Sequence, residues 1–272
     1  MNLPVRNARI QLSQSNLFWH EVGQGPTVVF LHGSWADSSQ WIAVMQAMSH
    51  QYHCLAPDLP GFGESSLSSA PISIALMTEC LAEYLQALRS PVVYLVGHSL
   101  GGWVAANYAL RYPEGVKGLI LIEPEGIESR RLAKRWRWYR LLSGPFSILL
   151  KGLSLLTPFA AYLGLKDFFH RLYPVRQRLK TFPTACRLLF QRRPAEIRAE
   201  QLQEQLPQLQ PPLLLLESSQ TSDLTQPLNE DYQHLVPHAQ VVVIGDCQSP
   251  LESPQQAAQL IGQFIQSANA TE

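Results

Sequence analysis

The chain has 272 residues, and 46% of them are hydrophobic, which suits a single large α/β domain with an insertion. Its formal net charge is zero, and its four cysteines lie far apart with no C-x-x-C pair. This pattern gives no indication of a zinc site or a disulfide framework, and it fits a reducing, cytoplasmic setting. The first twelve residues also lack the apolar core of a secretory signal.

The zero net charge hides an uneven distribution. Residues 127–200 contain 16 Lys and Arg against 4 Asp and Glu, a charge of +12, and the remainder holds 5 basic and 17 acidic residues, a charge of −12. The chain therefore carries a basic insert in an acidic body.

The N-terminal part alternates strands with tight turns. Residues 8–12 and 16–22 are predicted strands, residues 27–31 a buried strand and residues 54–56 a further strand. A helix is predicted over 38–50, and another over 72–88 follows the loop DLPGFGESS at residues 58–66.

The stretch PVVYLVGHSLGGWVAANYA, residues 91–109, organises the rest of the chain. The apolar run 92–96 predicts a buried strand, and the segment rich in small residues after Ser99 predicts a helix. In such a G-x-S-x-G turn the flanking Gly97 and Gly101 allow strand and helix to close together, which exposes the serine hydroxyl. Ser99 is therefore a candidate nucleophile.

Backbone N–H groups near Ser99 are candidates for an oxyanion hole. The N–H of Leu100, at the start of the helix, is one expected donor. The turn HGSW at residues 32–35 is expected to supply the second, from Ser34 or Trp35. His32 itself is expected to be a structural hydrogen bonder, because the donor needed here is a neighbour's backbone N–H.

The C-terminal part completes the alternation of strands and helices. Strands are predicted over 116–122, 213–216 and 241–244, and helices over 227–235 and 254–265. Between them, residues 127–207 contain predicted helices over 130–142, 158–172 and 184–190, with breaks at proline and glycine.

The motifs HGSW, DLPGFGESS and GHSLGG, in this order and each after a strand, resemble those of the α/β-hydrolase fold superfamily, in particular its small cap-bearing esterase, lipase and dehalogenase-like members. The resemblance covers roughly residues 8–126 and 211–267. It implies an α/β fold with a mostly parallel central sheet flanked by helices. Residues 1–126 and 208–272 would form the hydrolase core, and residues 127–207 a basic, apolar helical cap inserted after the sixth strand.

The resemblance also implies a Ser, acid, His order for the catalytic residues. Asp223 fits the acid best, because Asp223 to Pro227 is similar to the family's D-x-x-x-P. Glu123, at the end of the preceding strand, is the alternative acid. A solvated loop carboxylate is the non-catalytic interpretation of either residue.

The histidine that the resemblance implies is missing. The family pattern G-H-x-x-x-x-E-x-P aligns with GDCQSPLESP at residues 245–254. Cys247 or Gln248 occupies the histidine position, depending on the alignment. Glutamine does not titrate, and a cysteine would need a depressed pKa to act as a base. Among the other histidines, only His170 in the insert is expected to reach the pocket, and a surface or packing role is the more common one for such a residue.

The insert has its own pattern. Residues 141–165 are unusually apolar and follow six basic residues between 130 and 140, but lysine, glycine and proline within the segment argue against a transmembrane span. An apolar lining of a substrate pocket is one interpretation. A basic helix resting on an anionic membrane surface is the other.

Two functions follow from these patterns. The first is a serine hydrolase that acts on a carboxylic ester or related acyl substrate with an apolar part, and that has an incomplete triad. The second is a catalytically silent member that binds a lipid-like ligand or an anionic membrane surface through its cap. We expect no metal, cofactor or nucleic acid, because no motif for them accompanies the aromatic and basic residues. The expected location is cytoplasmic, with possible peripheral contact with the membrane.

Overall fold

The computed structural model describes residues 3–68, 70–128, 136–137, 139–140, 175, 177–220, 226–245 and 247–270. The chain divides into two units, Met1–Ile127 with Glu200–Glu272, and Glu128–Ala199. The predicted cap limits, residues 127–207, stay a prediction. The apolar segment 141–165, Asp223 and His170 lie outside the described residues.

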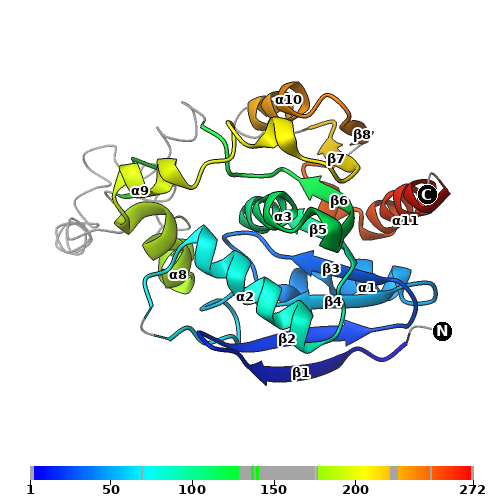
Figure 1. Ribbon diagram of the computed structural model, residues 1–272, viewed down its shortest axis with the longest axis horizontal. Coiled ribbons are helices and arrows are strands. Elements are labelled where there is room, and N and C mark those ends of the chain that lie inside the picture. Colours follow the sequence, from blue (N-terminus) through cyan, green and yellow to red (C-terminus); the bar gives the residue numbers. More distant parts are fainter. Residues whose placement is uncertain are drawn as a thin grey trace, which may run out of the picture. The chain divides into compact units, whose positions relative to one another are not determined.

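An eight-stranded sheet forms the centre of the first unit, in the order β1-β2-β4-β3-β5-β6-β7-β8 (Figure 1). The first three strands of this order pair antiparallel, and every later pair is parallel. The predicted fold class, a mostly parallel sheet flanked by helices, is thereby confirmed. The strands are β1 (Arg6–Gln11), β2 (Asn16–Val22), β3 (Thr27–Leu31), β4 (His53–Pro57), β5 (Val93–His98), β6 (Val116–Ile122), β7 (Leu213–Ser218) and β8 (Gln240–Ile244).

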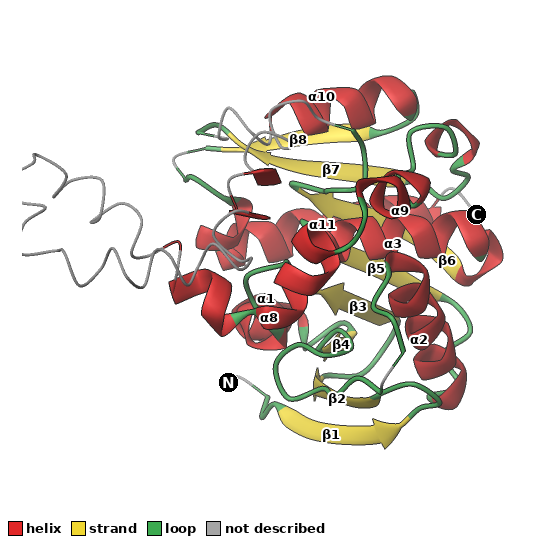
Figure 2. Ribbon diagram, turned by 90° about the vertical axis from the view of Figure 1, so that its left-hand side faces the viewer, coloured by secondary structure: helices red, strands yellow, loops and turns green. Residues whose placement is uncertain are grey.

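Helices cover both faces of the sheet (Figures 1 and 2). Two of them, α2 and α3, pack against each other on one face, whereas α1 and α11 pack against each other on the other. The α-helices of this unit are α1 (Ile42–Met48), α2 (Ile74–Ala87), α3 (Leu100–Arg111), α10 (Gln226–Leu235) and α11 (Pro254–Ala270). Short helical turns are η1 (Ser38–Trp41), η2 (Pro113–Gly115), η4 (Leu206–Gln208) and η5 (Pro250–Glu252).

Local sequence explains where several helices begin. The side chain of Ser73 accepts from the N–H of Leu76 and caps α2, and the side chain of Asp37 accepts from the N–H of Ser39 at η1. The helix predicted over residues 38–50 is split into η1 and α1. Its first turn is 3₁₀, a common form of a helix N-terminus.

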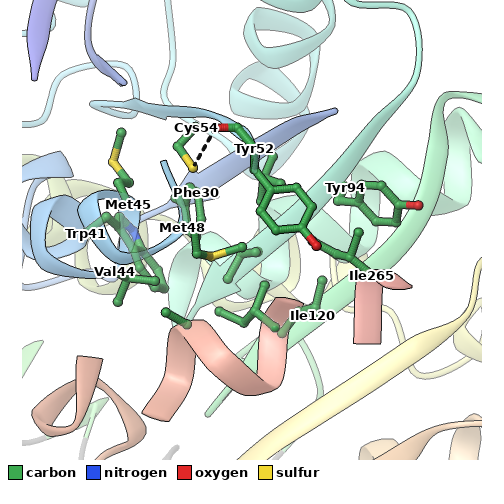
Figure 3. Packing of buried hydrophobic residues seen from close by; sticks show 14 of the residues in the cluster. Phe30, Trp41, Val44, Met45, Met48, Tyr52, Cys54, Tyr94, Ile120 and Ile265 are labelled. Atoms are coloured by element: carbon green, nitrogen blue, oxygen red, sulfur yellow. Dashed lines mark hydrogen bonds between the residues drawn. The ribbon is translucent and has the colours of Figure 1, made fainter. Parts of the chain in front are cut away.

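A large apolar cluster fills the space between the sheet and helices α1 and α11 (Figure 3). Alternate residues of the strands, such as Val28 and Phe30 on β3, point into this cluster. Trp41 and Met45 enter it from the η1 and α1 segment, and Ile265 enters it from α11. This packing holds the parallel strands in register and so fixes the loops at their carboxyl ends.

The described part of the second unit is helical. It includes α8 (Pro183–Cys186), the π-helical turn η3 (Arg187–Gln191) and α9 (Pro194–Ala199), and residues 177–181 are also helical. The rings of Trp136 and Tyr139 meet Phe190 edge to face, with centroids 6.2 and 5.6 Å away. Among the described residues, no helix is long and apolar enough to cross a membrane.

Candidate active site

Ser99 lies at the turn between β5 and α3. Its backbone has φ +51° and ψ −113°, a strained conformation for a residue with a side chain. A Cβ on Gly97 would come within 2.5 Å of the Gly101 carbonyl oxygen, and one on Gly101 would overlap the Leu31 carbonyl. Glycine is therefore required at both flanking positions, as the sequence motif suggests.

The loop after β3 lies directly beside Ser99. A Cβ on Gly33 would stand 3.3 Å from the Cβ of Ser99 and 2.7 Å from Nδ1 of His98. Ser34 is buried and Trp35 is half-buried in this loop. The predicted oxyanion residues Ser34 and Trp35 thus follow β3, and Leu100 opens α3, at the same carboxyl edge of the sheet.

His32 has a structural role. Its Nδ1 lies 2.9 Å from the Gly33 carbonyl oxygen, and its Nε2 accepts from the N–H of Leu59 at 2.9 Å. Burial lowers the pKa of His32 below the usual 6.5, so the ring is neutral. Both ring nitrogens are therefore used, and His32 links the loop after β3 to the loop that begins at Asp58.

Within the described part of the chain, the carboxylate that contacts Ser99 is that of Glu125. Ser99 Oγ donates to Oε1 of Glu125 at 3.0 Å, and Glu125 is only 9% exposed. Sequence reasoning missed this contact. The segment Glu123 to Gly126 could have indicated it, because this segment directly follows β6, the strand that pairs with β5.

The backbone of Glu125 is held on both sides. Its N–H donates to the Ser99 carbonyl oxygen at 3.1 Å. Its own carbonyl accepts from the hydroxyl of Tyr232, on α10, at 2.7 Å. Burial, with a smaller effect from the nearby Glu125 charge, raises the pKa of Tyr232, so this hydroxyl stays protonated and remains a donor.

The alternative acid, Glu123, faces a different partner. Its Oε2 lies 3.6 Å from Nε2 of His98, and its backbone has φ +48°. Within the described residues, Nδ1 of His98 is buried without a hydrogen bond. Glu123 therefore pairs with His98, and Glu125, two residues later, pairs with Ser99.

The structure describes both residues at the predicted histidine position. Cys247 is buried and packs with Ile244 and Ala257, and its sulfur lies 3.8 Å from Oγ of Ser218. Gln248 is exposed, and its backbone N–H donates to Oε2 of Glu252 at 2.8 Å.

A cavity of about 400 Å³ lies elsewhere, lined by Arg6, Glu21, Ser49 and His50 among others. It adjoins the end of β2, where Val22 pairs with Cys54 near the start of β4. This is the amino edge of the parallel strands, opposite Ser99, so the cavity is not part of the candidate site.

Comparisons with known proteins agree with this fold. A model of the alpha/beta hydrolase family matches residues 28–260. The 1-acylglycerol-3-phosphate O-acyltransferase ABHD5 of Mus musculus is 34% identical over 183 residues, covering 60% of this chain and 52% of that protein. The pimeloyl-[acyl-carrier protein] methyl ester esterase of Aeromonas hydrophila is 37% identical over 100 residues, covering 37% of this chain and 38% of the esterase.

The chain thus spans about half the length, or less, of these curated relatives. Among solved structures, a bacterial membrane phospholipase A superposes with a TM-score of 0.73 at 26% identity, covering 97% of this chain and 87% of that one. A serine hydrolase of Cycloclasticus zankles gives a TM-score of 0.74 at 23% identity, covering 97% and 98%, a likeness of fold alone. By its sheet, its Ser99 turn and a family match over most of its length, this chain belongs to the alpha/beta hydrolase family.

Proposed function

We propose that the protein is a serine hydrolase that acts on a carboxylic ester or a related acyl compound with an apolar part, with Ser99 as the nucleophile. The observation that carries this proposal is the hydrogen bond from Ser99 Oγ to the buried Glu125 carboxylate, at a strained strand-to-helix turn. A serine hydroxyl becomes a useful nucleophile only when a neighbouring group takes its proton.

The backbone N–H groups of Leu100 and of Ser34 or Trp35 would stabilise the oxyanion formed from the substrate carbonyl. Their place at the carboxyl edge of the sheet, beside Ser99, supports this part of the proposal. Esterase and acyltransferase names among the relatives favour acyl chemistry. Asp223 as the acid stays a prediction, because it lies outside the described residues.

Hydrolysis of p-nitrophenyl esters of increasing acyl length tests the proposal. The wild type should release p-nitrophenol, Ser99→Ala should be at least about 10³-fold slower, and a fluorophosphonate probe should label the wild type at Ser99. A folded wild type that neither hydrolyses any of these esters nor accepts the probe contradicts the proposal.

A catalytically silent protein is the alternative, and the environment of Cys247 and Gln248 favours it. The Cys247 side chain is packed in a small apolar cluster and Gln248 is exposed, which supports the proposal that the usual base is lost. In that case the wild type is inactive and Gln248→His gains esterase activity.

Membrane contact through the basic residues 127–200 belongs to this alternative, as does a cytoplasmic, peripheral location. The protein should then sediment with vesicles that contain anionic lipid, and high salt should release it. Equal sedimentation with neutral and anionic vesicles contradicts the proposed contact with an anionic membrane.

A further inference from the structure

We propose that Glu125 is the proton acceptor for Ser99 and so replaces the histidine that is missing after β8. This inference rests on the proposed function, because it assigns a base to the same nucleophile. It makes the reactive pair a serine and a carboxylate in direct contact, 3.0 Å apart, with no imidazole between them.

The contact has the geometry that a general base needs. A group that removes a proton must lie within about 2.6–3.2 Å of the donor oxygen. Oε1 of Glu125 meets this requirement, and no other side-chain carboxylate among the described residues is shown to bond Ser99 Oγ. Glu125 is also 9% exposed, so its carboxylate faces Ser99 within the protein.

The loop that carries Glu125 is built to hold it there. Positive φ angles at Glu123 (+48°) and Gly126 (+109°) turn the chain on either side of it. Pro124 packs against α3, where a Cβ on Gly102 would come within 3.0 Å of the proline. A Cβ on Gly126 would stand 2.6 Å from the ring of Trp103, so only glycine allows this close approach.

Among the described residues, the rival acceptors do not bond Ser99 Oγ. Both ring nitrogens of His32 are used in loop contacts, and Nε2 of His98 faces Glu123 at 3.6 Å. Nδ1 of His98 is buried but makes no hydrogen bond, to Ser99 or to any other described residue. The sulfur of Cys247 packs against Ile244 and Ser218. Glu125, by contrast, already accepts a hydrogen bond from the Ser99 hydroxyl.

The reaction balances with these groups. As Oγ of Ser99 bonds to the acyl carbon, its proton passes to Oε1 of Glu125 and the carbonyl electron pair moves to the oxygen. The oxyanion then collapses, the bond to the leaving oxygen breaks, and Glu125 returns the proton to that oxygen. Water attacks the acyl-Ser99 ester in the same way, with Glu125 accepting its proton and then giving one to Ser99 Oγ. One ester and one water give one acid and one alcohol.

The test variant is Glu125→Gln. The control is Glu79→Gln, which removes the same charge from an exposed residue of α2 that pairs with Arg111. We expect Glu125→Gln to lower kcat for p-nitrophenyl esters, and the rate of fluorophosphonate labelling, by about 10²- to 10⁴-fold with little change in KM. Glu79→Gln should stay within about twofold of the wild type, since exposed ion pairs contribute little.

A second variant separates a catalytic role from a structural one. Glu125→Ala should regain part of its activity when sodium formate is added, because a small carboxylate can enter the space and accept the proton. Formate should not affect Ser99→Ala. Glu125→Asp, which keeps the carboxylate but draws it back by one methylene, should lie between the wild type and Glu125→Gln.

The outcomes distinguish this inference from the function on which it rests. A wild type that is inert to esters and to the probe overturns both. A wild type whose activity depends on Ser99 but survives within tenfold in Glu125→Gln, or is lost in Glu123→Gln instead, overturns only the assignment of Glu125. If Glu125→Gln does not fold, the formate response of Glu125→Ala and the rate of Glu125→Asp decide the question.

Discussion

At the residue scale, the site combines two strained backbone positions, Ser99 and Glu123, with a hydrogen bond from Ser99 to the nearby Glu125. Ser99 and Glu123 both have positive φ without being glycine, a conformation that costs of order 1–3 kcal/mol and persists only where surrounding structure enforces it. The bond from Ser99 to Glu125 and the hydroxyl of Tyr232 on the Glu125 carbonyl are part of that enforcement.

Tyr232→Phe tests the positioning of Glu125. The change removes a buried donor and leaves the Glu125 carbonyl without that bond, so the protein should lose about 1–3 kcal/mol of stability. Because the carboxylate is then held less firmly, kcat should fall several-fold while KM stays the same. Steady-state kinetics and thermal unfolding measure the two effects. An unchanged kcat in a destabilised variant would show that Tyr232 is structural only.

His32 makes a prediction about pH. Its pKa is lowered in the folded state, so below pH 6.5 the unfolded chain binds more protons than the folded one. The stability that the neutral ring contributes is present above this pH and is lost progressively as pH falls. The melting temperature should therefore drop between pH 7.5 and 5.5 by more in the wild type than in His32→Gln. Equal drops in the two proteins would contradict the prediction.

At the scale of elements, the approach of α3 to the sheet depends on Gly97 and Gly101. These positions let the helix begin directly against β3 and β5, which brings Ser99 to the carboxyl edge of the strands. The α1 and α11 layer supports the same strands from the other face.

Two glycine-to-alanine changes in helices should have opposite effects. Gly101→Ala places a methyl group on the Leu31 backbone, so it should cost more than about 1–3 kcal/mol and abolish activity. Gly262→Ala, in α11, meets nothing closer than 3.9 Å and should stabilise the protein by about 0.4–1 kcal/mol. Urea unfolding midpoints give both values. A tolerated Gly101→Ala would mean that α3 moves without cost.

At the scale of the whole molecule, the four cysteines report on global unfolding. All are free and buried. Burial raises the pKa of Cys54 to about 12 and that of Cys80 and Cys186 to about 11, so these three thiols form few thiolates at neutral pH.

A thiol reagent such as DTNB should therefore react slowly with the native protein at pH 8 and with four thiols after denaturation. Reaction should accelerate in parallel with unfolding in urea, because exposure of the core controls it. Fast reaction of one native thiol would identify a unit that opens locally.

Local sequence determined the fold to a large extent. The strand over residues 116–122 and the helix start at Pro254 match the structure, because hydrophobic runs and breaker residues act over short range. The Ser99 turn followed from its glycines, whose requirement is also local. The helix after Pro254 extends further than predicted, to Ala270, where Ala268 packs against the apolar cluster and Asn269 accepts a hydrogen bond from the Tyr94 hydroxyl.

The partner of Ser99 was decided by tertiary structure alone. Glu123 and Glu125 are both carboxylates after the same strand, and composition cannot tell them apart. Their roles differ because positive φ angles at Glu123 and Gly126, the contact of Pro124 with α3 and the bond from distant Tyr232 turn one carboxylate to His98 and the other to Ser99. Short-range patterns specify strands, helices and turns, whereas the direction of a loop side chain depends on contacts between residues far apart in the chain.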